Sequence, residues 1–171
     1  MGKRRAARER ALQVLFELEF NESAPEEVLA RPGDPPRRPA SGDDYAGRLV
    51  RGILARRDEI DGLIHQASKN WRIARMGVVD RNILRIAVFE MLEDALLTPG
   101  IVINEALEIA KRFGGEESVV FINGVLDALG RKIRPDETEK ETQNSHERTE
   151  DPPSSPAPAR SRSLRGRSSQ E

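Results

Sequence analysis

The chain has 171 residues, a formal net charge of −1 and no cysteine. This length suits one ordinary domain, and the lack of cysteine excludes disulfides, zinc–thiolate sites and thiol nucleophiles. No apolar run approaches the ~18 residues of a membrane span, and the basic start leads into an amphipathic pattern rather than a signal-peptide core, so we expect a cytoplasmic protein.

Apolar residues recur at helical spacing along the first part of the chain, and strand-like alternation is absent there. The first helix is predicted over 4–21, and a short helical turn is predicted over 25–30. The segment 31–42 contains four prolines and two glycines and is predicted to be a loop. Ser41 or Asp43 is expected to cap the helix that follows.

From Tyr45 to Trp71, apolar residues follow steps of three, four or seven. This spacing predicts either one long helix or two stacked helices broken near 57–58. Trp71 stands at the end of the stripe, which favours a place in the core over a role as a stacking platform. The next helix is predicted over 77–95, and its wide apolar face indicates a central helix covered on most sides.

Local signals delimit the last two helices. Thr98-Pro99 suits the start of one helix, and Gly114-Gly115 suits its end. Acidic residues at Glu116 and Glu117 favour the start of the last helix, where the helix dipole attracts negative charge. The sum of these elements predicts an all-α helical bundle of five or more helices.

A change in composition divides the chain after residue 133. In 134–171 the only large aliphatic residue is Leu164, and Pro, Ser, Arg and Glu dominate. Such a segment buries too little apolar surface to offset the entropy of ordering it. We therefore predict one helical domain over 1–133, followed by a disordered tail over 134–171.

Side chains suited to catalysis or metal binding are few. His65 and His146 are the only histidines, and they are expected on the surface and in the tail. Acidic pairs such as Glu105 and Glu108 could bind Mg²⁺ in principle, but a solvated helix face explains them better. Phosphate-binding glycine patterns are absent. We expect no catalytic residue, no metal and no cofactor.

The first helix begins with an arginine cluster that includes Arg4, Arg5 and Arg8. On a helix, Arg5 and Phe16 lie on nearly the same face, three turns or about 16 Å apart. Arginine binds phosphate through its planar fork, and a single-stranded base stacks on an aromatic ring. These residues leave two interpretations open, an RNA track or a solvated terminus with Phe16 in the core.

Four blocks of sequence resemble the NusB family and occur in that family's order. They are RRAARERALQVLF (4–16), VVDRNILRIAVFEM (78–91), INEALEIAKRF (103–113) and SVVFINGVLD (118–127). The resemblance covers 3–133 and leaves the tail unmatched. It implies an all-α fold of two three-helix-like halves joined along a long helix, and a non-enzymatic role in transcription antitermination on ribosomal RNA transcripts.

The resemblance also implies partners and site residues. NusB pairs with NusE, a ribosomal protein of the small subunit, and the pair binds single-stranded boxA RNA in the RNA polymerase antitermination complex. Phe16 takes a place where tyrosine is usual, so stacking is retained and a hydroxyl group is lost. Asp80 matches an acidic position that faces NusE. The residues that the resemblance assigns to RNA binding are Arg4, Arg5, Arg8, Phe16, Glu117 and Phe121.

Two other functions stay open at this stage. A helical adaptor that binds only proteins would not need the arginines of the first helix. Some ribosomal RNA cytosine methyltransferases carry a NusB-like N-terminal domain, but they require a catalytic cysteine beyond it, and this chain has none. A homodimer of the free protein also stays open, since dimerisation would hide an RNA-binding surface.

Overall fold

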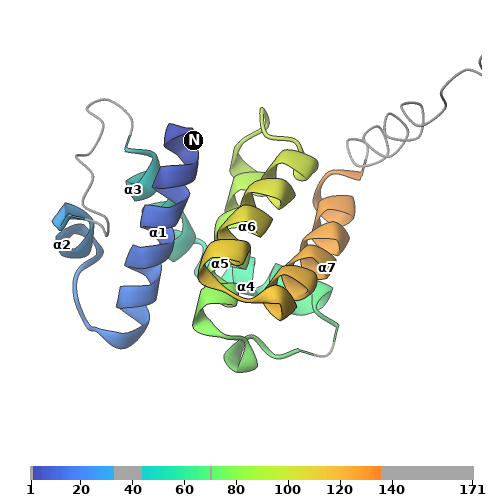
Figure 1. Ribbon diagram of the computed structural model, residues 1–171, viewed down its shortest axis with the longest axis horizontal. Helices are drawn as coiled ribbons and strands as arrows, with labels where there is room; N and C mark the ends of the chain where they lie inside the picture. The colour runs from blue at the N-terminus through green and yellow to red at the C-terminus, as the bar shows by residue number, and fades with distance from the viewer. Residues whose placement is uncertain (1, 33–43, 70, 136–171) are drawn as a thin grey trace, which may run out of the picture.

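The computed structural model describes residues 2–32, 44–69 and 71–135, and Figure 1 shows them as a bundle of helices. No strand occurs in this part of the chain, which confirms the predicted all-α class. Nearly all of the predicted loop and tail lie outside the described residues. The elements are α1 (Lys3–Phe20), α2 (Pro25–Ala30), α3 (Tyr45–Ala55), α4 (Arg57–Ala67), the 3-10 turn η1 (Ile73–Arg75), α5 (Val78–Glu93), α6 (Pro99–Phe113) and α7 (Glu116–Ile133).

The helix boundaries follow local chemistry, with one correction to the sequence prediction. Asp44, rather than Ser41 or Asp43, caps α3, because its carboxylate accepts a hydrogen bond from the Gly47 amide at 3.0 Å. Ser41 and Asp43 themselves lie outside the described residues. The long stripe that begins at Tyr45 divides into α3 and α4 at Arg56, one residue before the predicted break.

Helix α5 is the centre of the bundle. It contacts α1, α3, α4, α6 and α7, and Figure 1 shows it between the N-terminal and C-terminal helices. Residues 82–91 are buried without interruption, including the polar residues Asn82, Arg85 and Glu90. This confirms the prediction of a covered central helix and explains why its apolar face is so wide.

The other helices form two groups on either side of α5. Helices α1, α2 and α3 contact one another, and α4, α6 and α7 contact α5 in the second group. The first half thus has three helices, and the second half has four when α5 is counted with it. The Phe89 ring of α5 packs directly against the α3 backbone at Gly52, because a Cβ atom there would lie 2.1 Å from Cζ of Phe89.

A buried arginine on α5 ties three helices together. The Arg85 guanidinium donates to both carboxylate oxygens of Asp61 on α4, at 2.7 and 2.8 Å, and to Glu19 on α1 at 2.7 Å. Desolvation by burial lowers the pKa of Arg85, but the hydrogen bonds and charges of Asp61 and Glu19 together outweigh it, and the net effect is a raised pKa. The network compensates one buried cation with two carboxylates, which is the condition for burying a charge at acceptable cost.

The domain extends slightly beyond the end of α7. The Arg134 side chain donates hydrogen bonds to the backbone carbonyls of Leu97 at 2.7 Å and Asp94 at 2.8 Å. These two carbonyls belong to the connection between α5 and α6. Arg134 therefore fastens the end of α7 to the neighbouring part of the bundle.

Candidate nucleic-acid interface

The three arginines of α1 differ sharply in their surroundings. The Arg4 side chain is about half exposed and meets Asp94 at 3.3 Å. Arg5 is at the surface but donates two hydrogen bonds to the Glu105 carboxylate, at 2.9 and 2.6 Å. Arg8 is only 3% exposed. Of the three, Arg4 and Arg5 are the ones whose guanidinium groups solvent can reach in the free protein.

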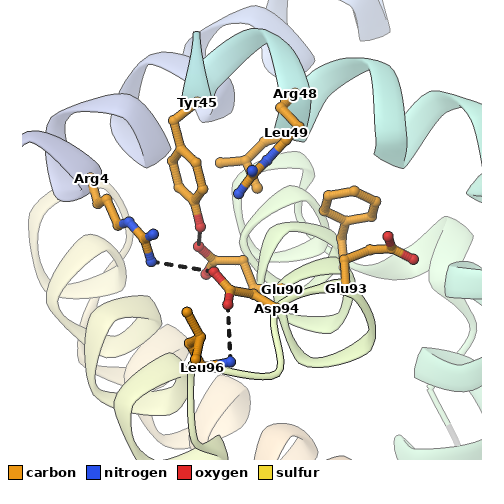
Figure 2. Close-up of a pocket in the computed structure, with 9 residues that line it drawn as sticks. Arg4, Tyr45, Arg48, Leu49, Glu90, Glu93, Asp94 and Leu96 are labelled. Carbon is orange, nitrogen blue, oxygen red and sulfur yellow. Dashed lines mark hydrogen bonds and ion pairs between the residues drawn. The ribbon is translucent and has the colours of Figure 1, made fainter. Parts of the chain in front are cut away.

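Arg8 belongs to a buried polar cluster. Its Nε donates to the Glu90 carboxylate at 2.8 and 3.0 Å, and its Nη1 donates to Glu105 at 3.1 Å. The Tyr45 hydroxyl donates to the same Glu90 carboxylate (Figure 2). The Glu90 carboxylate therefore accepts hydrogen bonds from a charged donor on α1, Arg8, and from a neutral donor on α3, Tyr45.

Burial shifts the acid–base properties of this cluster. Desolvation raises the pKa of Glu90, and the opposing attraction of the Arg8 guanidinium does not fully cancel that effect. Burial, followed by the hydrogen bond to Glu90, raises the pKa of Tyr45 to about 12. The ring of Tyr45 also lies beneath the guanidinium groups of Arg48 at 4.9 Å and Arg4 at 5.2 Å. The cluster stabilises the junction between the helices and contains no arrangement suited to a reaction.

The far end of α1 carries two exposed aromatic rings. Phe16 is 41% exposed and Phe20 is 65% exposed, and their ring centroids lie 5.0 Å apart. The interpretation that placed Phe16 in the core is therefore wrong. Phe20 was not identified from the sequence, although its spacing of four residues from Phe16 places both rings on one helix face.

A second aromatic pair joins the connection between α4 and η1 to α7. Trp71 is 55% exposed, and its ring centroid lies 5.9 Å from that of the half-buried Phe121. The expectation of Trp71 in the core is wrong because α4 ends at Ala67 and Lys69 has a positive φ of 52°. Helical spacing thus no longer applies at Trp71. Glu117 is exposed one turn before Phe121.

Asp80 occupies the first turn of α5 and is half-buried. The helix dipole favours an acidic side chain at that position. Within the described ranges its carboxylate takes part in no ion pair or side-chain hydrogen bond, whereas the next residue, Arg81, pairs with Glu19 at 3.0 Å. The carboxylate of Asp80 is thus available to a basic partner.

Two further observations concern the described residues as a whole. No group of three or more His, Cys, Asp or Glu side chains among them is arranged to hold a metal ion. None of the helices described is both long enough and apolar enough to cross a membrane.

The sequence and fold match proteins of one family. The NusB family profile matches residues 5–131. The transcription antitermination protein NusB of Desulforapulum autotrophicum is 44% identical over 143 residues, which cover 82% of this chain and all of the relative. The same protein of Geobacter sulfurreducens is 45% identical over 135 residues, which cover 78% of this chain and 97% of the relative.

Solved structures give the same result. A structure of T. maritima NusB has a TM-score of 0.70 and 34% identity, covering 82% of this chain and 99% of the other. A structure of the antitermination factors NusB and NusE in complex with double-stranded RNA has a TM-score of 0.61 and 27% identity, covering 75% of this chain and 96% of the other. The family is not catalytic, which confirms that the chain is not an enzyme. This chain is a member of the NusB family of transcription antitermination proteins.

Proposed function

We propose that this protein binds single-stranded boxA RNA together with NusE and joins the RNA polymerase antitermination complex on ribosomal RNA transcripts. The observation that carries the proposal is the exposed pair of rings formed by Phe16 and Phe20, three helical turns along α1 from the accessible arginines. The solved complex of NusB and NusE with RNA, which shares this fold, supports both partners.

The arginines divide into two roles under this proposal. Arg4 and Arg5 contact phosphates, because their guanidinium groups reach the surface. Arg8 pairs with Glu90 on α5 and Glu105 on α6, holds α1 against these helices, and so positions the other two arginines. A phosphate must displace the Glu105 carboxylate from Arg5, whereas the one ion pair of Arg4, with Asp94 at 3.3 Å, is longer and easier to replace.

The remaining contacts are assigned by their chemistry. Phe16 stacks on a base, with Phe20 beside it. Phe121 offers a second ring, and the Glu117 carboxylate accepts a hydrogen bond from a base amino group rather than contacting phosphate. Asp80 forms an ion pair with a basic residue of NusE.

Salt dependence of RNA binding separates phosphate contacts from stacking. Each phosphate contact that is lost on a single strand lowers the log–log salt slope by about 0.7. The variant Arg4→Gln/Arg5→Gln should therefore flatten the slope by roughly 0.7 to 1.4 units and weaken boxA and scrambled RNA alike. Phe16→Ala should keep the slope and lose about 1–3 kcal/mol of binding free energy.

The titration is made with and without NusE, and the melting curve of each variant is checked first. The rival function, an adaptor that binds only proteins, predicts that the wild-type protein binds NusE normally and shows no affinity for boxA RNA above that for a scrambled strand. A wild-type salt slope in the Arg4→Gln/Arg5→Gln variant would remove these arginines from the RNA surface.

A further inference from the structure

The segment that connects α4 to α5 combines an exposed ring with unpaired positive charge. Trp71 lies there against Phe121, and Lys69, Arg72 and Arg75 are all exposed. None of these three cations forms an ion pair or side-chain hydrogen bond within the part of the chain that the structure describes. The stretch 69–75, which contains these residues, has no acidic residue.

This segment differs from the rest of the basic surface. Nearly all other arginines and lysines of the described residues contact a carboxylate, an amide, a backbone carbonyl or a ring, as Arg5 does with Glu105. A phosphate that approaches an unpaired cation displaces only water and counterions, and no internal ion pair must break. The described cations whose side chains make none of these contacts are Lys3, Lys69, Arg72, Arg75 and Arg131.

Hydrogen bonds hold the described residues at both ends of the segment, although several of its side chains are exposed. The Trp71 amide donates to the Ser68 carbonyl at 3.2 Å, and the Ser68 hydroxyl donates to the Trp71 carbonyl at 3.0 Å. Met76, only 6% exposed, anchors the far end in the core. The Trp71 backbone is thus held in place by Ser68, so that a ligand loses little entropy by binding to its ring.

The segment also lies at the same end of the bundle as the exposed rings of α1. In Figure 1 the C-terminal end of α1, the green turn η1 and the start of α7 all lie at the lower end of the molecule. That end carries Phe16 and Phe20 on α1, and Phe121 near the start of α7. An extended strand bound to the α1 rings can therefore continue across the same end of the bundle.

We propose that Trp71 and Phe121 form a second base-stacking platform, and that Lys69, Arg72 and Arg75 bind the phosphates of the same single-stranded RNA. This inference rests on the proposed function and extends its RNA surface beyond α1. A single strand fits better than a duplex, because stacking needs bases that are not already stacked. It also fits better than an apolar protein segment, because the ring is flanked by three uncompensated positive charges.

The platform can be observed directly, because Trp71 is the only tryptophan of the chain. Full-length protein with saturating NusE is titrated with single-stranded boxA RNA, and tryptophan fluorescence is followed. The signal of the Trp71→Phe variant under the same conditions is subtracted, so that any fluorescence of NusE is removed. A base stacked on Trp71 should quench the difference signal, and an unchanged signal at saturating RNA overturns the proposal.

Affinities measured by anisotropy of labelled boxA RNA test the contributions separately. Trp71→Ala should weaken binding by roughly 5- to 150-fold, corresponding to the loss of one base stack, whereas Trp71→Phe should keep most of the affinity. The variant Lys69→Gln/Arg72→Gln/Arg75→Gln should flatten the salt slope by roughly two units. Arg131→Gln is the matched control, since Arg131 is also exposed and unpaired among the described residues but lies in the last turn of α7 at the opposite end of the bundle.

The outcomes distinguish this inference from the proposed function. If wild-type protein binds boxA RNA and the Trp71 and triple-glutamine variants bind it with unchanged affinity and slope, the second platform is refuted and the α1 surface stands. The inference is also overturned if these variants lose NusE affinity while RNA binding is unchanged. Wild-type protein that shows no RNA binding at all overturns the proposed function and this inference together.

Discussion

Replacing Arg8 by glutamine should destabilise the fold far more than it affects an RNA surface. Arg8 is 3% exposed and donates to Glu90 at 2.8 and 3.0 Å and to Glu105 at 3.1 Å. Removing one partner of a buried ion pair costs about 3–5 kcal/mol, because the other charge stays buried without compensation. We therefore expect the free energy of unfolding of Arg8→Gln at neutral pH to fall by about 3–5 kcal/mol, a large share of the ~5–15 kcal/mol typical of a domain.

The loss should depend on pH in a defined direction. Burial already raises the pKa of Glu90 in the presence of Arg8, and loss of that guanidinium should raise it further. A carboxyl group with a raised pKa in the folded state binds its proton more tightly there than in the unfolded chain. The deficit of Arg8→Gln should therefore shrink as the pH falls from about 7.5 to about 5, by at most ~1.4 kcal/mol per pH unit for one proton.

A second variant removes the unpaired charge. Arg8→Gln/Glu90→Gln should recover part of the lost stability at neutral pH and should lack the pH dependence of the single variant. Urea unfolding followed by circular dichroism measures both effects. The reasoning is refuted if Arg8→Gln is within about 0.5 kcal/mol of wild type, or if the second substitution restores nothing. A stable Arg8→Gln protein with weakened RNA binding would instead assign Arg8 to the RNA surface.

Three further predictions concern other parts of the molecule. Gly52→Ala should lower the free energy of unfolding in a urea titration by about 1–3 kcal/mol, because its Cβ would lie 2.1 Å from Cζ of Phe89. Gly62→Ala on α4 is the control, and it should be neutral or stabilising because no atom lies within 4 Å of the new Cβ. Asp80→Lys should weaken NusE binding by several kcal/mol in calorimetry, since it replaces an attraction by a repulsion between like charges; unchanged affinity with an intact helical signal would exclude Asp80 from that interface. Deletion of 136–171, which the sequence predicts to be disordered, should shift the melting temperature by no more than a few degrees, and a larger loss would mean that this segment docks on the domain.

The helices could be predicted from the sequence wherever their ends depend on neighbouring residues. Thr98 and Pro99 begin α6, and Gly114 follows its last residue, as expected. The cap of α3 was assigned to the wrong residues because several polar residues stand in a row before Tyr45, and only the backbone geometry selects Asp44. Signals of this kind operate within three or four residues.

Long-range pairing is the part that the sequence did not reveal. Arg8 was grouped with Arg4 and Arg5 because all three are adjacent in sequence, but its partners lie 82 and 97 residues away. The exposure of Trp71 depends on where α4 ends. The helix ends at Ala67, and Lys69, two residues later, has a positive φ angle. Residue type identified an arginine-rich helix end, whereas the tertiary fold decides which of its charges face solvent.

The Arg85 network has a consequence for how the domain opens. One side chain of α5 holds a carboxylate from each of α1 and α4, and α5 also contacts α3, α6 and α7. Neither half can therefore separate from the other without breaking the contacts of α5 and exposing the buried Arg85 network. Amide hydrogens of α5 should exchange only through global unfolding, and those of α1 and α4 that lie next to Glu19 and Asp61 should exchange at the same slow rate, as one cooperative unit.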